Sequence, residues 1–255
     1  MARILLLGGH GKIAMKMTRI LAARNHTVTS IIRNPDHAEE IRALDSKPHH
    51  VNPVVASIEE ADDDSAKKLM ENIDWVIWSA GAGGKGGEER TKAVDEVAAK
   101  RFIAAAIASP TPSKFLMVSA NCSRRSPASY WTEKDIEGYQ ETWKVIPAYC
   151  EAKTVADEFL WTESRKVVGK KWQDICLRPG WLLDEPGNGK VDLGRAKTHG
   201  GVPRDDVAAV AVELLEKSDM ENKNAAGLWI DLVGGDEPIL DAVNRVLVDK
   251  ASSRE

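Results

Sequence analysis

Short runs of β-branched and other apolar residues alternate along the chain with longer segments of helical periodicity. This alternation is typical of βαβ units, in which crossover helices join parallel strands. The strands are predicted at residues 4–7, 27–32, 53–56, 75–80, 115–119, 174–177 and 228–233. The helices are predicted at residues 12–24, 62–72, 88–108, 147–164 and 205–217, with another opening at Pro35 and a last one near the carboxyl terminus.

This order of elements predicts an α/β fold with a doubly wound parallel sheet in a three-layer α/β/α arrangement. The chain has 255 residues, which suits one large domain, and we assign residues 1–250 to it. Two segments, at about 122–146 and 179–203, interrupt the alternation. We expect them to form the substrate side. The second would be a small elaboration of the carboxyl-terminal half, in which residues 184–185 and 187–201 form either a mobile lid or an ordinary surface loop.

Charge and cysteine content narrow the class of protein. The formal net charge is −4, so the surface as a whole offers no footprint for nucleic acid or an anionic membrane. No apolar run has the length of a signal peptide or a membrane span. Cys122, Cys150 and Cys176 lack zinc-motif or disulfide-framework spacing, so we expect isolated thiols, or a redox-sensitive Cys150 beside Tyr149. We expect a cytoplasmic monomer or homodimer that acts on a small molecule and binds no metal.

A glycine-rich turn links the first predicted strand to the first helix. Gly8, Gly11 and Ala14 have the spacing of a dinucleotide-binding turn. Gly8 would permit the tight turn, Gly11 would let the backbone approach a pyrophosphate, and Ala14 would allow close packing of helix on strand. Exposed peptide N–H groups at the positive end of the helix would hold the phosphates. The turn predicts a Rossmann fold whose phosphate site includes Gly8, Gly9, His10, Gly11, Lys12 and Ile13.

The residue that follows the second predicted strand bears on the choice of nucleotide. NAD-binding proteins usually place Asp or Glu about 20 residues after the glycines, where the carboxylate bonds the ribose hydroxyls. Here Arg33 lies 33 − 11 = 22 residues after Gly11, and a guanidinium can pair with a 2′-phosphate and stack on adenine. Lys12 and His10 would add positive charge. The sequence therefore predicts NADP(H) as the cofactor, in preference to NAD.

Tyr149 and Lys153 form a Y-x-x-x-K pair in the helix predicted at 147–164. The i,i+4 spacing places both side chains on one face of the helix, one turn apart. The ordinary pKa of a tyrosine is about 10, which makes it a poor proton shuttle at neutral pH. A nearby ammonium favours the phenolate and would lower that pKa toward the working pH. The pair is therefore a candidate acid–base centre.

The chain resembles the atypical short-chain dehydrogenase/reductases of the nitrogen-regulator-like and flavin/biliverdin-reductase-like group over nearly its whole length. The motifs that carry the resemblance lie at 8–14, 79–84, 149–157, 178–187, 204–208 and 231–235. The resemblance implies that Tyr149 donates a proton to a substrate carbonyl and that Lys153 bonds the nicotinamide ribose. It also implies nucleotide contacts from Ser57 and Ile58 at the adenine, from Ala80, Gly81 and Ala82 at the ribose and pyrophosphate, and from Pro179, Gly180, Trp181 and Leu182 at the nicotinamide.

The family's catalytic serine follows the fifth strand, and its counterpart in this chain depends on the register chosen for residues 117–121. Ser119 takes the position in one register, whereas Ala120 or Asn121 takes it in others. The asparagine of the family's proton relay has no identifiable counterpart in the helix predicted at 88–108. Ser119 joins Tyr149 and Lys153 in the catalytic set predicted here, with the possibility that the serine is missing.

Aromatic residues gather in the two substrate-side segments. Tyr130, Trp131 and Trp143 lie between the fifth strand and the Tyr149 helix, at the edge where doubly wound sheets bind ligands. Trp181 follows the Pro-Gly pair expected beside the nicotinamide. These four residues are expected to line an apolar substrate pocket, or else to serve only in packing.

The function predicted from these residues is that of an NADPH-dependent oxidoreductase of a small carbonyl-like or conjugated, apolar substrate. Hydride would come from the nicotinamide and a proton from Tyr149, with Lys153 tuning the pKa of the Tyr149 phenol. The alternatives are a flavin- or quinone-type reductase, in which no tyrosine proton is needed, an epimerase with a tightly held cofactor, and a non-catalytic NADP-sensing regulator.

Overall fold

The computed structural model describes residues 1–45, 49–84, 86–221 and 223–255. Its main sheet consists of β1 (Arg3–Leu7), β2 (Thr27–Ile32), β3 (Val51–Val55), β4 (Trp75–Trp78), β5 (Lys114–Val118), β6 (Gln173–Pro179), β8 (Lys190–Gly194), β10 (Leu228–Gly234) and β11 (Glu237–Pro238). The strand order is β11-β8-β10-β6-β5-β4-β1-β2-β3. Pairing is parallel from β3 to β10, and β8 pairs antiparallel with both β10 and β11. The order of the first six strands confirms the predicted doubly wound sheet.

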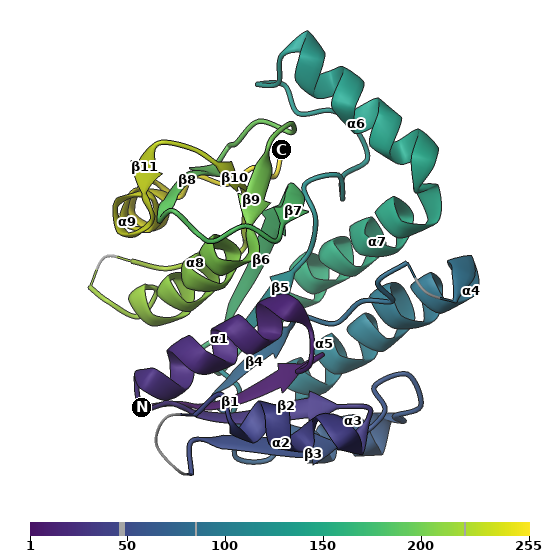
Figure 1. The fold of residues 1–255 in the computed structure, drawn as a ribbon, viewed down its shortest axis with the longest axis vertical. Helices are drawn as coiled ribbons and strands as arrows, with labels where there is room; N and C mark the ends of the chain where they lie inside the picture. The colour runs from purple at the N-terminus through teal and green to yellow at the C-terminus, as the bar shows by residue number, and fades with distance from the viewer. Residues whose placement is uncertain (46–48, 85, 222) are drawn as a thin grey trace.

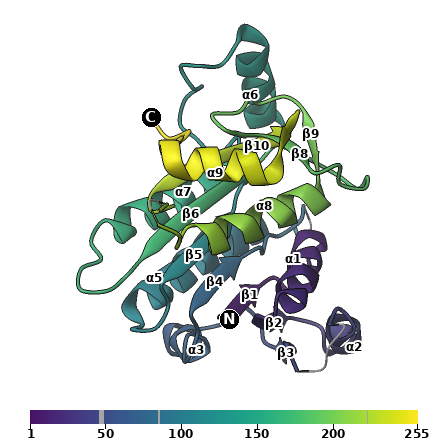
Figure 2. The same cartoon turned by 90° about the vertical axis from the view of Figure 1, so that its left-hand side faces the viewer.

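Helices cover both faces of this sheet, so the three-layer prediction is also confirmed (Figures 1 and 2). One layer contains α1 (Lys12–Ala23), α8 (Arg204–Lys217) and α9 (Ile239–Asp249). The other contains α3 (Asp63–Leu69), α5 (Ala99–Ala108) and α7 (Pro147–Ser164). A 3-10 turn at Pro35–His37 leads into the short α2 (Ala38–Arg42), which packs beside β3. None of the described helices is long and apolar enough to cross a membrane.

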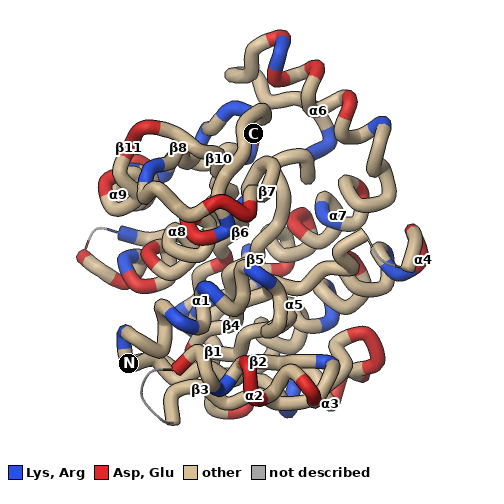
Figure 3. Tube along the Cα trace, in the orientation of Figure 1, with Lys and Arg blue, Asp and Glu red and all other residues tan. Residues whose placement is uncertain are grey.

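The central strands are apolar on both faces because helices cover both. On β4, Trp75 and Ile77 pack toward α1 and α8, whereas Val76 and Trp78 pack toward α3 and α5. Buried parallel strands are therefore continuous hydrophobic runs and do not alternate with polar residues. At the surface, Lys and Arg are interleaved with Asp and Glu (Figure 3).

The long helix predicted at 88–108 is irregular in its first half. It consists of α4 (Gly87–Thr91), a π-helical segment at Lys92–Ala98, and α5. The π-helical segment buries Val94 and Asp95. Widened turns of this kind occur often at functional sites, and this one faces α7.

The two substrate-side segments contain more regular structure than the sequence pattern indicates. The first contains α6 (Glu133–Val145), which begins with a capping box between Thr132 and Asp135 and projects at the top of Figure 1. The second contains β7 (Trp181–Leu183), β8 and β9 (Gly201–Pro203), with β7 and β9 paired in parallel. The expectation of a mobile lid or plain loop is therefore wrong for β8, because hydrogen bonds on both sides hold it in the main sheet.

Candidate active site

The turn after β1 is shaped by two close approaches of backbone to neighbouring strands. Gly8 has φ +86°, and a Cβ placed there would lie 2.7 Å from the Cα atom of Ala80. The Gly9 amide donates to the Ile31 carbonyl at 2.8 Å, and a Cβ on Gly9 would lie 2.0 Å from Ser30 Oγ. Both positions therefore require glycine for steric reasons.

The amino terminus of α1 is open to an anion. Gly11 is its N-cap, no described side chain caps the helix, and its first turn contains no acidic residue. Ala14 is fully buried, as close packing of helix on strand requires. Uncapped N–H groups and the positive end of the helix dipole fit the phosphates of a dinucleotide. Ile13 is buried in the core beneath this turn.

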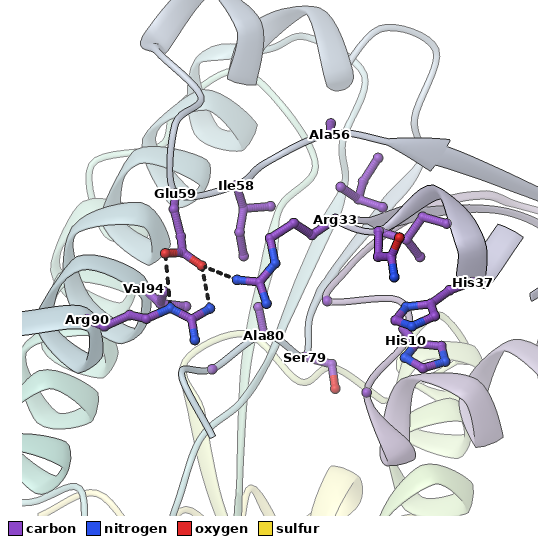
Figure 4. A pocket seen from close by; sticks show the side chains of 16 residues that line it. His10, Arg33, His37, Ala56, Ile58, Glu59, Ser79, Ala80, Arg90 and Val94 are labelled. Carbon is purple, nitrogen blue, oxygen red and sulfur yellow. Dashed lines mark hydrogen bonds and ion pairs between the residues drawn. The ribbon is translucent and has the colours of Figure 1, made fainter. Parts of the chain in front are cut away.

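A pocket of about 240 Å³ extends from this turn across the ends of β2 and β4 (Figure 4). Arg33 and Arg90 both reach Glu59: Arg33 Nη1 lies 3.0 Å and Arg90 Nη2 2.7 Å from Glu59 Oε1. Hydrogen bonding from Arg90, and charge from both arginines, lower the pKa of Glu59. Glu59 thus holds both guanidiniums at the pocket wall. The residues that line the pocket are Gly8, His10, Gly11, Ile31, Ile32, Arg33, Asn34, His37, Ala56, Ile58, Glu59, Ser79, Ala80, Gly81, Arg90 and Val94.

Five residues of the predicted phosphate, ribose and adenine set are not among the described lining residues of this pocket: Gly9, Lys12, Ile13, Ser57 and Ala82. Lys12 turns away from the pocket and pairs with Asp184 at 2.8 Å, which Arg204 also contacts at 2.8 Å. Ser57 lies outside the lining, where its Oγ accepts from the Glu60 amide. The Ala82 amide donates inward to Asp95 Oδ2 at 2.9 Å.

The predicted Tyr149–Lys153 pair lies on α7, whose bounds match the prediction. Lys153 Nζ lies 5.8 Å from the centre of the Tyr149 ring. It also forms an ion pair at 2.9 Å with Asp95 of the π-helical segment, and both side chains are at least 95% buried. Asp95 therefore contacts both the loop after β4 and the lysine of the candidate acid–base centre.

The surroundings of Tyr149 shift its pKa opposite to the sequence-based expectation. Burial raises the pKa of Tyr149 more than the Lys153 ammonium lowers it. Burial lowers the pKa of Lys153, but Asp95 and Tyr149 raise it by more, so the lysine stays charged. Lys153 therefore acts on the Tyr149 pKa in the predicted direction, but the predicted net lowering is wrong, because burial outweighs the ammonium, whose charge Asp95 also balances.

Tyr149 lines a second cavity, of about 460 Å³, which has no described lining residue in common with the first. The stretch predicted to flank a nicotinamide, Pro179–Leu182, forms part of its wall, with the Trp181 side chain 78% exposed. The volume falls in the usual range for small-molecule sites. The lining consists of Ala120, Asn121, Cys122, Gly138, Tyr139, Thr142, Ile146, Tyr149, Pro179, Gly180, Trp181, Leu182, Thr198, His199, Gly200 and Arg204.

Of the four aromatic residues proposed for this cavity, Trp181 alone is among the described lining residues. The indole of Trp131 donates to the Ala196 carbonyl at 3.0 Å, and that of Trp143 to the Cys122 carbonyl at 3.0 Å. The Tyr130 hydroxyl donates to Asp231 Oδ2 at 3.1 Å. These three side chains therefore hold α6 and its flanking loops in place.

Ser119 lies beneath the cavity. Its hydroxyl donates to Asp157 Oδ2 at 2.8 Å and lies 3.1 Å from that of Ser123, in a fully buried cluster. Asn121 lines the cavity instead, with its Nδ2 donating to the Thr198 carbonyl at 2.9 Å. Of the positions open to the sequence, Ala120 and Asn121 are among the described lining residues of the cavity, and Ser119 is not.

Sequence reasoning missed three residues that help to form these two sites. Arg90 lies in α4 and Asp95 in the π-helical segment. In this irregular helix the hydrophobic pattern did not indicate which side chains face the site. His199 lines the second cavity and pairs with Asp135 at 2.7 Å. The only local signal was the Thr132–Asp135 capping box, which marks the start of the helix that holds Asp135.

Fold and site together define a dinucleotide-binding α/β protein with a second cavity lined by Tyr149. The family described as NAD(P)H-binding matches residues 8–218. The chain belongs to that family, within the atypical short-chain dehydrogenase/reductases, and is an NAD(P)-dependent oxidoreductase- or epimerase-like protein.

Two curated relatives are similar over nearly their whole length. The UPF0659 protein C216.03 of Schizosaccharomyces pombe is 34% identical and matches 99% of this chain and 98% of its own. The uncharacterized sugar epimerase YhfK of Bacillus subtilis is 28% identical, over 96% of this chain and 100% of its own.

Solved structures show the same fold. A candidate NAD-dependent epimerase/dehydratase from Bacillus halodurans is 25% identical, with a TM-score of 0.76 over 96% of this chain and 100% of its own. ChuY, an anaerobilin reductase from Escherichia coli O157:H7, is 20% identical, with a TM-score of 0.68 over 92% of this chain and 98% of its own.

Proposed function

We propose that this chain is an NADPH-dependent reductase of a small carbonyl-like or conjugated substrate, with Tyr149 as the proton donor. The observation that carries the proposal is the position of Tyr149 in the wall of a cavity that also includes Pro179–Leu182. NADPH would supply hydride from its nicotinamide when bound. The protein's own residues orient the substrate, exclude water and deliver the proton.

The preference for the phosphorylated nucleotide rests on Arg33 and Arg90. Both line the first pocket, and both guanidiniums are positioned there by the same carboxylate, that of Glu59. An NAD-binding site would instead offer an unpaired carboxylate to the ribose hydroxyls. The Glu59 carboxylate is already held by two guanidiniums, so the group favours a 2′-phosphate.

The protonation state of Tyr149 suits the role of proton donor. An ordinary tyrosine is protonated at neutral pH, and burial raises the pKa of Tyr149 further, so the phenol has a proton to donate. We assign to Lys153 the binding of the nicotinamide ribose, since Asp95 fixes its ammonium within the site. Asn121 lines the cavity and is better placed than the buried Ser119 to bond a substrate oxygen.

Tyr149→Phe tests the proposal. NADPH oxidation is measured with aldehydes, ketones and enones, and we expect turnover to fall about 10²- to 10⁴-fold, as for loss of a general acid. Nucleotide affinity should stay unchanged. The control is Tyr139→Phe, because Tyr139 lines the same cavity while its hydroxyl donates to the Arg124 carbonyl at 2.9 Å. Full turnover by the Tyr149→Phe protein would remove Tyr149 from the reaction.

A flavin- or quinone-type reductase is the second candidate. The exposed indole of Trp181, together with Tyr139 and Tyr149 in the same lining, offers faces on which a flat conjugated ring can stack. Such an acceptor takes hydride without a tyrosine proton. Turnover of free flavins or quinones by the Tyr149→Phe protein, at the rate of the unchanged chain, would favour this function over carbonyl reduction.

A further inference from the structure

Two of the three cysteines meet beside the second cavity. Cys122 lies in the loop after β5 and Cys150 in the first turns of α7, and their Sγ atoms are 3.3 Å apart. The expectation of isolated thiols is therefore wrong for this pair. Cys150 is fully buried and Cys122 is 5% exposed. The two pack in a small cluster with Ala120 and Tyr149.

Only one of the two thiols is accessible from the second cavity. Cys122 is part of the cavity lining and Cys150 is not. A small reagent that enters the cavity therefore meets the Cys122 sulfur first, with the Cys150 sulfur directly behind it. Cys176 is buried in β6 and lines neither of the two cavities, so it provides an internal comparison.

The two thiols differ electrostatically. The Cys150 thiol donates a hydrogen bond to Cys122 Sγ, and that bond, with the charge of the buried Arg178, lowers the pKa of Cys122 despite its burial. The same bond and burial raise the pKa of Cys150. Burial raises the pKa of Cys176 as well. Because the thiolate is the reactive form, Cys122 is the most nucleophilic of the three.

We propose that Cys122 and Cys150 form a two-thiol oxidation site that opens into the substrate cavity and reacts with a hydroperoxide. The Cys122 thiolate attacks a peroxide oxygen; an S–O bond forms, the O–O bond breaks, and hydroxide or alkoxide leaves. The Cys150 thiol then gives up its proton and attacks the Cys122 sulfenic sulfur. The S–S bond forms, the S–O bond breaks, and water leaves. Two thiols thus supply the two electrons that reduce one hydroperoxide.

The geometry requires little movement for the second step. A disulfide has an S–S distance of about 2.05 Å, so sulfurs now 3.3 Å apart approach by little more than 1 Å. The bond would join the loop after β5 to the residue next to Tyr149. If Tyr149 is the proton donor proposed above, oxidation should also lower turnover, with nucleotide affinity unchanged. The thiol chemistry itself does not depend on that function.

The test is oxidation of the full chain by hydrogen peroxide, followed by thiol counting, intact mass and peptide mapping. We expect loss of two of the three thiols, one intramolecular Cys122–Cys150 disulfide, and complete reversal by dithiothreitol. Cys176 should react at least tenfold more slowly. The Cys176→Ser control should form the same disulfide at the same rate.

Two further variants separate the roles of the pair. In Cys150→Ser, Cys122 should stop at the sulfenic acid, which dimedone traps. In Cys122→Ser, neither remaining thiol should react at the rate of Cys122, and this variant decides the question if Cys150→Ser fails to fold. Oxidation of Cys122 that yields only sulfinic acid in the unchanged chain, disulfides between molecules, or equal reactivity of all three thiols would each overturn the proposal. None of these readouts requires turnover, so they are independent of the reductase assignment.

Discussion

The nucleotide half and the substrate half of this molecule are built by different means. Around β1–β3, the site is mainly backbone: a glycine turn, an uncapped helix end and one half-exposed arginine cluster. Around β5, β6 and β10, in contrast, the candidate site depends on buried charged side chains. The Lys153–Asp95 pair is at least 95% buried, and Arg178, Asp157 and Asp231 are fully buried nearby.

This difference has a physical basis. A phosphate can be held by peptide N–H groups that a short local segment presents, so few side chains are needed. A proton donor needs a fixed side chain in a controlled electrostatic environment, which only contacts between distant segments can provide. Nucleotide binding by the nucleotide half should therefore be sensitive to added atoms. The stability of the substrate half should be sensitive to the removal of charges.

The largest effect on nucleotide binding is expected from Gly8→Ala. The new methyl group would lie 2.7 Å from Ala80 Cα at a backbone φ of +86°, so the turn must move. We expect nucleotide affinity, measured by calorimetry, to fall about 100-fold, or ~2.8 kcal/mol. Gly169→Ala is the control, since its φ is +77° but a Cβ there meets nothing within 4 Å. It should lose about 1–2 kcal/mol of unfolding free energy from backbone strain alone and bind nucleotide normally. Normal binding by Gly8→Ala would mean that the turn tolerates added atoms.

Asp95→Asn tests the buried charge of the substrate half. It keeps the shape of the side chain but leaves the Lys153 ammonium buried without its counter-ion. Removing one partner of a buried pair costs about 3–5 kcal/mol, so the free energy of unfolding should fall by that amount in denaturant titrations. Glu96→Gln, in the same π-helical segment, breaks a 4.0 Å pair with the partly exposed Lys100 and should cost less than about 1 kcal/mol. Equal losses of unfolding free energy in Asp95→Asn and Glu96→Gln would show that the buried ion pair contributes no more to stability than the partly exposed one.

The same contrast explains what the sequence could predict. The strand–turn–helix of residues 3–23 and the whole span of α7 follow from local periodicity, glycine spacing and a proline at the first helical position. α6 was missed because its surface is largely polar and its packing comes from Tyr139 and flanking aromatic residues. Asp95 was missed because its role depends on a lysine 58 residues away (153 − 95), which only the folded chain brings near.

The stability of the substrate half should also depend on pH through Asp174 at the start of β6. Burial raises the pKa of Asp174 to about 6, although Arg165 opposes the shift. The folded protein then holds a proton that the unfolded chain has already released, so stability falls as pH rises from 4 to 6, by about 3 kcal/mol. Asp174→Asn should flatten this slope in denaturant titrations across that range.

Asp74→Asn, beside β1, is the matched control. Hydrogen bonding from Arg3 lowers the pKa of Asp74, so its contribution to stability is lost only as pH falls below the ordinary value of 3.8. Between pH 4 and 6 this variant should keep the slope of the unchanged chain. A slope that survives in Asp174→Asn would assign the pH dependence to another group.

The smallest effect is expected from Arg33→Ala, because the Arg33 side chain is 65% exposed and Arg90 remains beside Glu59. Losing one partly solvated guanidinium should weaken NADPH binding about tenfold, or ~1.4 kcal/mol, and leave NADH binding nearly unchanged. Arg42→Ala removes a comparably exposed arginine, 52%, from the same half but outside the pocket, and should alter neither affinity. Titration of NADPH and NADH into the unchanged chain, Arg33→Ala and Arg42→Ala measures the ratio of the two affinities in each protein. If Arg33→Ala weakens NADPH and NADH equally, this arginine contributes to binding but does not select the nucleotide.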